Sequence, residues 1–336
     1  MNILVTGGAG FIGTHTLIAL IEAGYTPIVV DDFSNSCPEA LRRVEEITGQ
    51  TILQYALDIC NAELLSAVFE AHSIDAVIHF AAKKAVGESV KEPLLYYSNN
   101  IMGTLTLLNC MHTYDVKRFV FSSSATVYGK PASNPITEDF PLSAENPYGQ
   151  TKLMIEQMLL DIGKANPDMS IVALRYFNPI GAHKSGRIGE VPNGIPNNIM
   201  PYITNVAVGK LERLSVFGDD YETSDGTGVR DYIHVVDLAE GHAAAIAWAL
   251  THTGVEYVNL GTGSGTSVLD LVSAFERNTG VTIPYAITAR RPGDIGECYA
   301  NPGKALAIFG WKTRYTLDDM CRDAWRWQSR NPDGFR

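Results

Sequence analysis

A glycine-rich turn near the N-terminus constrains the fold more than any other feature of the sequence. Residues 3–5 form an apolar run typical of a strand, and Gly7, Gly10 and Gly13 follow at intervals of three around the start of a helical pattern over residues 11–22. One glycine permits the tight bend from strand to helix, one lets the backbone approach a pyrophosphate, and one allows the helix to pack closely on the strand. The N-terminus of the helix adds free N–H groups and the positive end of its dipole. Although a glycine-rich turn alone also suits a flexible loop, this context predicts a dinucleotide-binding unit.

The first half of the chain alternates short apolar runs with helical patterns. Strands are expected at residues 3–5, 27–30, 52–55, 76–80, 119–121 and 171–174. Helices are expected at residues 11–22, 41–47, 63–71 and 97–114, and another follows Pro147. Strands that alternate with helices form βαβ units, in which a parallel sheet is covered on both faces. We therefore predict an α/β fold with a doubly wound parallel sheet of the Rossmann type.

The pattern changes after Asn178. Glycine and proline cluster at residues 179–196, which suggests a long ordered loop, and strand-like and helix-like segments then mix without regular alternation. We predict a Rossmann domain at residues 1–177 and a smaller, mixed α/β domain at residues 178–336 on the substrate side. The boundary is soft, because the chain can cross between the two domains more than once.

Asp31 indicates which dinucleotide binds. It ends the second expected strand, 18 residues after Gly13. A carboxylate at this place accepts hydrogen bonds from the adenosine ribose hydroxyls and repels the additional phosphate of NADP. Asp32 follows and no arginine is adjacent, so NAD is favoured over NADP. The alternative is that Asp31 caps a turn or a helix.

Tyr148 and Lys152 form the motif Y-x-x-x-K in the helical segment after Pro147. A spacing of four places both side chains on one face of a helix. Tyrosine, with an ordinary pKa of about 10, is a poor base at neutral pH, and a nearby ammonium group lowers that pKa by favouring the phenolate. Ser124 ends a run of three serines after the strand at 119–121, where parallel sheets bind their ligands. It either helps to pass the proton of a substrate hydroxyl or caps a loop.

The charge balance and the cysteines argue against several classes of protein. With 26 Lys and Arg against 37 Asp and Glu, the net charge is −11, which disfavours nucleic acid and anionic membranes but not a small anion held by local arginines. No apolar run approaches 18 residues and no leader pattern opens the chain, so we expect neither a membrane span nor a signal peptide. The five cysteines are widely spaced without a C-x-x-C pair, and we expect reduced thiols in the cytoplasm and no metal site.

The glycine turn, Asp31, Ser124, Tyr148 and Lys152 together resemble the extended short-chain dehydrogenase/reductase superfamily. Longer stretches resemble the UDP-glucose 4-epimerase family along nearly the full chain, at residues 79–82, 85–89, 122–129, 174–178, 195–201 and 226–234. The resemblance implies a bound NAD, a UDP-sugar substrate held by residues 178–336, and a homodimer.

The resemblance also implies the residues of each site. Catalysis would fall to Tyr148, Lys152 and Ser124. NAD would contact Gly7, Gly10, Phe11, Ile12, Gly13, Asp31, Asp32, Phe33, Ser34, Asn35, Ser36, Asp58, Ile59, Phe80, Ala81, Ala82, Lys84, Asn99, Ser124, Tyr148, Lys152 and Phe177. The UDP-sugar would contact Ser124, Tyr148, Tyr176, Asn178, Asn198, Ile199, Ser215, Val216, Phe217, Arg230, Tyr232, Arg291, Asp294 and Cys298. Guanidinium groups suit a diphosphate because they pair with phosphate oxygens in a fork. Without the resemblance, Arg230 and Arg291 would be interpreted as surface salt-bridge partners and Phe217 as a core aromatic.

The reaction that the resemblance implies is inversion at carbon 4 of the sugar. The Tyr148 phenolate would remove the proton of the 4-hydroxyl with Ser124 bridging, carbon 4 would become a transient ketone with NAD as the acceptor, and reduction from the other face would invert it. The nearest alternative is a nucleotide-sugar 4,6-dehydratase, but that family carries Asp-Glu where this chain has Ala125 and Thr126. A net oxidoreductase and a non-catalytic NAD-binding sensor are further alternatives, and the presence of all three catalytic residues argues against the sensor.

Cys298 bears on the choice of sugar. In the family, the residue before the Tyr-Ala of segment 298–300 lines the sugar pocket; it is tyrosine in members confined to sugars without an N-acetyl group and smaller in members that accept both. The resemblance therefore implies room for an acetamido group, and turnover of both UDP-glucose/UDP-galactose and UDP-N-acetylglucosamine/UDP-N-acetylgalactosamine. The alternative is a buried, small apolar residue whose neighbours fill the space.

Overall fold

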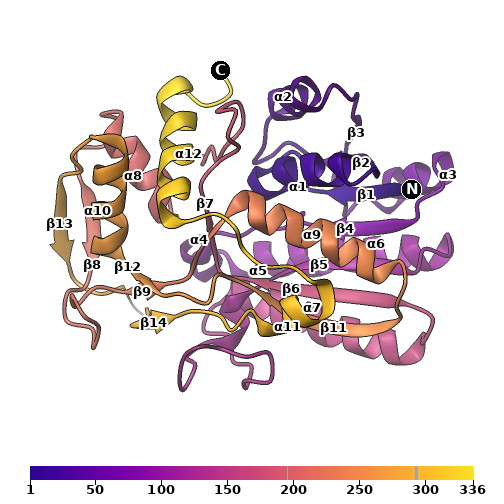
Figure 1. Cartoon of the computed structure of the whole chain (residues 1–336). Helices are drawn as coiled ribbons and strands as arrows, with labels where there is room; N and C mark the ends of the chain where they lie inside the picture. The colour runs from indigo at the N-terminus through magenta and orange to yellow at the C-terminus, as the bar shows by residue number, and fades with distance from the viewer. Residues whose placement is uncertain (195, 292–293) are drawn as a thin grey trace.

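The computed structural model describes residues 1–194, 196–291 and 294–336. Ile195, the first residue of the segment 195–201 that resembles the epimerase family, lies outside the described residues. Figure 1 shows a large sheet between two layers of helices, with a smaller group of strands and helices beside it.

Seven parallel strands form the central sheet. Their bounds are Asn2–Thr6 (β1), Thr26–Asp31 (β2), Leu53–Ala56 (β3), Ala76–His79 (β4), Arg118–Ser124 (β5), Ser170–Tyr176 (β6) and Gly254–Leu260 (β11). Their order is β11-β6-β5-β4-β1-β2-β3, and all six pairings are parallel. From β1 the order continues through β2 and β3 to one edge, and from β4 it continues through β5, β6 and β11 to the other. Ligands of such sheets bind between β1 and β4, where the direction reverses, outside the carboxyl ends of the strands. The predicted doubly wound sheet is confirmed.

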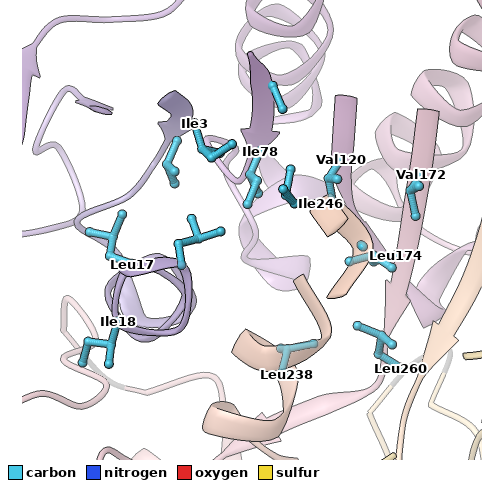
Figure 2. Close-up of a cluster of buried hydrophobic side chains, with 14 of the residues drawn as sticks. Ile3, Leu17, Ile18, Ile78, Val120, Val172, Leu174, Leu238, Ile246 and Leu260 are labelled. Atoms are coloured by element: carbon cyan, nitrogen blue, oxygen red, sulfur yellow. The ribbon is translucent and has the colours of Figure 1, made fainter. Parts of the chain in front are cut away.

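Helices cover both faces of the sheet. One face is covered by α1 (Phe11–Glu22), α2 (Pro38–Thr48), α9 (Val235–Ala249) and α11 (Gly303–Phe309), and the other by α3 (Ala62–Ala71), α6 (Gly103–Thr113) and α7 (Pro147–Ala165). Ile3 and Val5 pack in the first core cluster and Leu4 in the second, because successive side chains of a strand point to opposite faces. Figure 2 shows the first cluster, where Leu17 of α1 and Leu238 of α9 lie below the side chains of the sheet. Among the described residues, no helix combines the length and the apolar character needed to cross a membrane.

The segment predicted as one helix over residues 97–114 is irregular at its start. Two short helices, α4 (Val86–Lys91) and α5 (Pro93–Tyr96), lead into a π-helical turn, η1 (Tyr97–Met102), before α6 begins. The buried Asn100 in this turn accepts a hydrogen bond from Lys83 N at 2.9 Å and donates one to Thr151 Oγ1 at 3.0 Å. Such turns occur often at functional sites, and this one carries Asn99.

The described residues of the smaller lobe form three short sheets. β7 (Asn178–Ile180) pairs with β10 (Tyr232–His234), β8 (Leu214–Phe217) pairs with β13 (Tyr285–Thr288), and β9 (Val229–Arg230) lies between β12 (Thr266–Ser267) and β14 (Glu297–Cys298). Three helices enclose its core, α8 (Ile199–Ala207), α10 (Val268–Thr279) and α12 (Leu317–Arg330). The predicted mixture of strands and helices is confirmed.

The sequence patterns missed β11 and α9. β11 pairs with β6 along its full length, from Gly254 opposite Ser170 to Leu260 opposite Tyr176. Its sequence GVEYVNL is interrupted by Glu256 and Asn259, which hid the apolar run expected of a buried strand. The chain therefore returns to the central sheet after residue 178, and the division into residues 1–177 and 178–336 stays a prediction.

Candidate active site

The glycines of the turn between β1 and α1 differ in the space that is left for a Cβ atom. A Cβ atom on Gly13 would lie 2.6 Å from Gly7 O, and one on Gly7, whose φ is +69°, would lie 2.7 Å from Ala81 N. A Cβ on Gly10 would meet only Gly7 O, at 3.3 Å. Gly10 is the N-cap of α1 and no side chain caps the helix, so its first N–H groups face outward without a side-chain acceptor. This arrangement fits a pyrophosphate.

Asp31 connects the end of β2 to the glycine turn. Its Oδ2 accepts a hydrogen bond from Ala9 N at 2.9 Å, and its Oδ1 accepts from Phe33 N at 3.0 Å and Ser36 Oγ at 2.7 Å. Phe33 has a φ of +56°, in the left-handed region. The carboxylate therefore holds the turn, as in the capping alternative, and its role in binding the ribose stays a prediction.

The residues predicted to contact NAD follow the carboxyl ends of successive strands. They lie after β1 at 7–13, at the end of β2 and after it at 31–36, after β3 at 58–59, after β4 at 80–84, and next to β5 and β6. Since all these strands are parallel, their carboxyl ends share one edge of the sheet. Asn99 joins them from η1, where its backbone O lies 3.8 Å from Cys60 Sγ, beside Asp58. The structure thus brings these segments to one edge of the sheet.

Tyr148 and Lys152 lie on α7 against the end of β5. Lys152 is buried, its Nζ donates to Ser122 O at 2.6 Å, and it lies 5.9 Å from the centre of the Tyr148 ring. Ser124 Oγ accepts hydrogen bonds from Thr126 N at 3.2 Å and Thr126 Oγ1 at 3.0 Å. Ser124 therefore caps the short 3-10 helix η2 (Ala125–Tyr128), and its side chain is close enough to Tyr148 to lower the pKa of the phenol. The capping role of Ser124 is confirmed, and its role in proton transfer stays a prediction.

Burial affects the pKa values of both Tyr148 and Lys152. Burial raises the pKa of Tyr148 above its ordinary value, and the nearby Ser124 side chain acts in the opposite direction. Burial also lowers the pKa of Lys152 to about 7, while the charge of Glu156 acts in the opposite direction. The prediction that the Lys152 ammonium favours the phenolate of Tyr148 stays a prediction.

Glu190, which the sequence analysis missed, lies between the two lobes. Its Oε1 accepts hydrogen bonds from Lys84 Nζ at 3.4 Å and from Asn198 Nδ2 at 2.8 Å. Lys84 follows the central sheet and Asn198 is the N-cap of α8, so the carboxylate joins a predicted cofactor contact to a predicted substrate contact. A lone glutamate in the segment rich in glycine and proline carries no motif that would have revealed it.

Four predicted substrate contacts gather at the smaller lobe. Asp294 Oδ1 lies 2.5 Å from Arg230 Nη2, and its Oδ2 lies 3.1 Å from Arg291 Nη2. The Arg291 guanidinium lies over the ring of Phe217, 4.7 Å from its centre. Phe217 is exposed, so it is no core aromatic. The arginines are ion-paired, as in the salt-bridge alternative, but with a carboxylate that is itself a predicted site residue.

Other predicted substrate contacts have their side chains in the core. Tyr176, Val216 and Tyr232 are buried, and the hydroxyl of Tyr176 is hydrogen-bonded to His242 Nε2 at 2.9 Å. Ile199 packs against the core of the smaller lobe. Ser215 lies on β8 two residues before Phe217, on the same side of the strand. The assignment of the buried side chains to the substrate stays a prediction.

Cys298 lies beside Arg230. It is on β14, where the register pairs it with Arg230 of β9. It packs against a small cluster that contains Phe177 and Ala300. Burial raises the pKa of the thiol to about 11, so Cys298 is protonated at neutral pH.

The chain is similar to named proteins along its length. The model of the family described as GDP-mannose 4,6 dehydratase matches residues 4–324. A UDP-glucose 4-epimerase from Bacillus subtilis is 59% identical over 336 residues, covering 100% of this chain and 99% of that protein. The crystal structure of UDP-glucose 4-epimerase from Bifidobacterium longum in complex with NAD+ and UDP has 54% sequence identity and a TM-score of 0.97, covering 99% of this chain and 100% of that chain. The structure of UDP-glucose-4-epimerase from Stenotrophomonas maltophila with bound NAD and formylated UDP-arabinopyranose has 48% identity and a TM-score of 0.97, covering 99% of each chain.

Proposed function

This chain belongs to the UDP-glucose 4-epimerase family, and from that premise we propose which of its residues invert carbon 4 of a UDP-hexose. The protein is an NAD-dependent epimerase. Our assignment makes Tyr148 the acid–base group, Lys152 the cation beside it, and Ser124 the hydroxyl that bridges to the sugar. The observation that carries it is the convergence of these three side chains at the carboxyl edge of the sheet. Lys152 Nζ donates to Ser122 O at 2.6 Å and lies 5.9 Å from the centre of the Tyr148 ring, and the Ser124 side chain lowers the pKa of Tyr148.

The cofactor site fits NAD. The turn from Gly7 to Gly13 and the N-terminus of α1 would hold the pyrophosphate, and Asp31 would hold the adenosine ribose. The carboxylate of Asp31 disfavours the additional phosphate of NADP. When bound, NAD supplies the reversible redox chemistry that no protein side chain here provides.

The chain's own residues bind, orient and transfer the proton. Tyr148 takes the proton of the sugar 4-hydroxyl through Ser124 and returns it after the ketone has turned in the pocket. A positioned acid–base group of this kind contributes about 10² to 10⁴ in rate. Arg230 and Arg291 hold the diphosphate of the substrate when they exchange Asp294 for phosphate oxygens. The anchored nucleotide leaves the sugar free to present either face.

The 4,6-dehydratase alternative is not favoured, although the family model carries that name. Elimination of water from the sugar needs a carboxylate close to the catalytic serine. Ala125 and Thr126 stand at the two following positions, and the hydroxyl of Thr126 is used in a hydrogen bond to Ser124. Neither side chain replaces a carboxylate in acid–base chemistry.

Product analysis tests the function directly. The purified protein is incubated with UDP-galactose and, separately, with UDP-N-acetylgalactosamine, without added NAD, and the nucleotide sugars are separated. We expect the 4-epimer of each substrate and no net formation of NADH. Formation of a 4-keto-6-deoxy sugar would support the dehydratase instead, and a stoichiometric requirement for NAD would support a net oxidoreductase.

We propose that both plain and N-acetylated UDP-hexoses are substrates. The proposal rests on Cys298, whose short side chain lies next to Arg230 in the register of β14 and β9. The volume of a phenol ring is absent at this position, and an acetamido group at carbon 2 needs that volume. UDP-N-acetylgalactosamine that stays unchanged in the product analysis would restrict the enzyme to plain hexoses.

We also propose that the protein is a cytoplasmic homodimer. Apolar side chains are exposed on neighbouring helices: Val90 of α4 at 63%, Leu94 of α5 at 79%, Met102 of η1 at 57% and Met154 of α7 at 40%. Exposed apolar residues on packed helices suit an isologous contact with a second copy. Light scattering on a sizing column should give twice the mass of one chain, and Leu94→Glu should halve it; a monomeric wild type would contradict the proposal.

The proposed location in the cytoplasm is supported by the cysteines, because five free thiols suit a reducing compartment.

A further inference from the structure

The helical face that carries the catalytic residues continues to Glu156. Tyr148, Lys152 and Glu156 follow at intervals of four on α7, so they share one face of the helix. Lys152 Nζ donates to Ser122 O at 2.6 Å, and Ser123 Oγ donates to Glu156 Oε1 at 2.5 Å. The two residues of β5 that precede the catalytic serine are therefore both attached to this face of α7.

Arg175 of β6 completes the arrangement. The register of the sheet pairs Arg175 with Ser123, so both side chains lie on the face that α7 covers. Its Nε donates to Glu156 Oε1 at 3.0 Å and its Nη2 to Glu156 Oε2 at 2.6 Å. Its Nη1 donates to the hydroxyl of Tyr128 at 2.9 Å and to Glu138 O at 3.1 Å. Both charged side chains of the ion pair are only 2% exposed.

Stability alone does not account for a buried ion pair at this place. Well-packed apolar residues of similar volume often stabilise a protein as well as such a pair does, because desolvation offsets the attraction between the charges. A bidentate pair between arginine and a carboxylate does fix direction as well as distance. Here it fixes β6, β5 and α7 relative to one another, directly behind the catalytic groups.

We propose that Glu156 and Arg175 form a positioning pair, which holds the end of β5 against the catalytic face of α7 so that Ser124 meets Tyr148. The inference rests on the proposed roles of those two residues. Glu156 and Arg175 touch neither reacting atom and act through Ser123 and Lys152. Small displacements matter in such a site, since a shift of about 1 Å can cost roughly 100-fold in rate.

The pair also acts on Lys152 through charge. The titratable groups that face Lys152 are Tyr148 and Glu156 on α7 and His79 on β4, with Arg175 behind Glu156. Burial and the charge of Lys152 lower the pKa of His79 to about 3, so His79 is neutral. The carboxylate of Glu156 favours the ammonium form of Lys152, whereas burial opposes it. Removal of that charge moves the deprotonation of Lys152 to lower pH.

Glu156→Gln tests the proposal, because the amide keeps the size and one oxygen acceptor but lacks the charge. We expect kcat to fall by roughly 10- to 100-fold, with the KM for UDP-galactose and the NAD content unchanged. The alkaline limb of the kcat–pH profile should shift to lower pH. Glu156→Asp keeps the charge but not the reach, and it should lower kcat while leaving that limb in place. A folded Glu156→Gln protein with the kcat and pH profile of the wild type would overturn the proposal.

Ser123→Ala is a milder variant, and it tests the same proposal if Glu156→Gln does not fold. Its matched control is Thr204→Val, which removes another buried hydroxyl, on α8 of the smaller lobe. The Thr204 hydroxyl donates to Gln328 Oε1 of α12 at 3.3 Å. Ser123→Ala should lower kcat several-fold at unchanged KM, while Thr204→Val keeps the kcat of the wild type. Equal kcat values in the two variants would overturn the proposal. Wild-type turnover and its loss in Tyr148→Phe test the proposed function in the same assay, so the two failures are distinguishable.

Discussion

Replacement of Asp31 by alanine should affect the cofactor and the fold separately. The carboxylate accepts three hydrogen bonds, of which the one from the buried Ala9 N–H has no access to replacement water. A hydrogen bond to a charged acceptor contributes about 1.5 to 3 kcal/mol, whereas Phe33 N–H and Ser36 Oγ–H, which are partly exposed, recover much of theirs from water. We therefore expect a loss of about 3 kcal/mol in the free energy of unfolding. For 336 residues the unfolding entropy is about 0.7 kcal/mol/K, so Tm should fall by about 4 °C.

The same substitution should also lower the affinity of the protein for NAD. Two hydrogen bonds from ribose hydroxyls to a carboxylate are worth at least tenfold in affinity, so Asp31→Ala should be purified with clearly less NAD. The measurements are thermal unfolding of NAD-free protein and the NAD released on denaturation. Asp75→Ala is the matched control, because its exposed carboxylate accepts Asn2 N at 2.7 Å at the opposite end of the same sheet. An NAD content equal to that of the wild type would refute the ribose role, and a Tm equal to that of the control would refute the role in the turn.

Three further predictions concern catalysis, specificity and pH. Tyr148→Phe should nearly abolish turnover while NAD and UDP still bind, because only the ionisable oxygen is lost; more than about a tenth of wild-type activity would contradict acid–base catalysis by this residue. Cys298→Tyr should remove activity on UDP-N-acetylgalactosamine and spare UDP-galactose, and equal effects on both substrates would refute the pocket argument. His79 and His242 are buried with pKa values lowered to about 3 and about 4, mainly by desolvation. They stay neutral in the native state while the unfolded chain takes up protons below pH 6.5, so stability is full above that pH and should fall by about 2 kcal/mol per histidine between pH 6.5 and 5. Urea unfolding at pH 7 and pH 5 measures this loss, and an unchanged free energy would contradict it.

Features with a local cause could be predicted from the sequence. The turn around Gly7 needs residues without a Cβ at specific places, and α1 has the bounds that the apolar pattern predicted, residues 11–22. The spacing of Tyr148 and Lys152 places them on one face of a helix whatever the rest of the chain does. Local geometry and local chemistry were sufficient for these parts of the site.

Features that depend on distant parts of the chain could not be predicted. Glu190 became visible only because the fold brings Lys84 and Asn198 within reach of one carboxylate. The burial of Tyr148, which raises the pKa of its hydroxyl, also results from the fold and is not visible in the sequence. The sequence pattern does not reveal that Glu156 of α7 is buried, because its partner Arg175 lies on a different element, β6.

The return of the chain to the central sheet at β11 has a consequence for protein engineering. A fragment that ended at residue 177 would leave β6 as an open edge and would remove α9 from the apolar face of α1. The two lobes are therefore interwoven rather than joined by a linker, and the smaller lobe cannot be exchanged as an independent unit. A change of substrate preference in this architecture therefore calls for single substitutions, such as the proposed Cys298→Tyr, rather than exchange of a lobe.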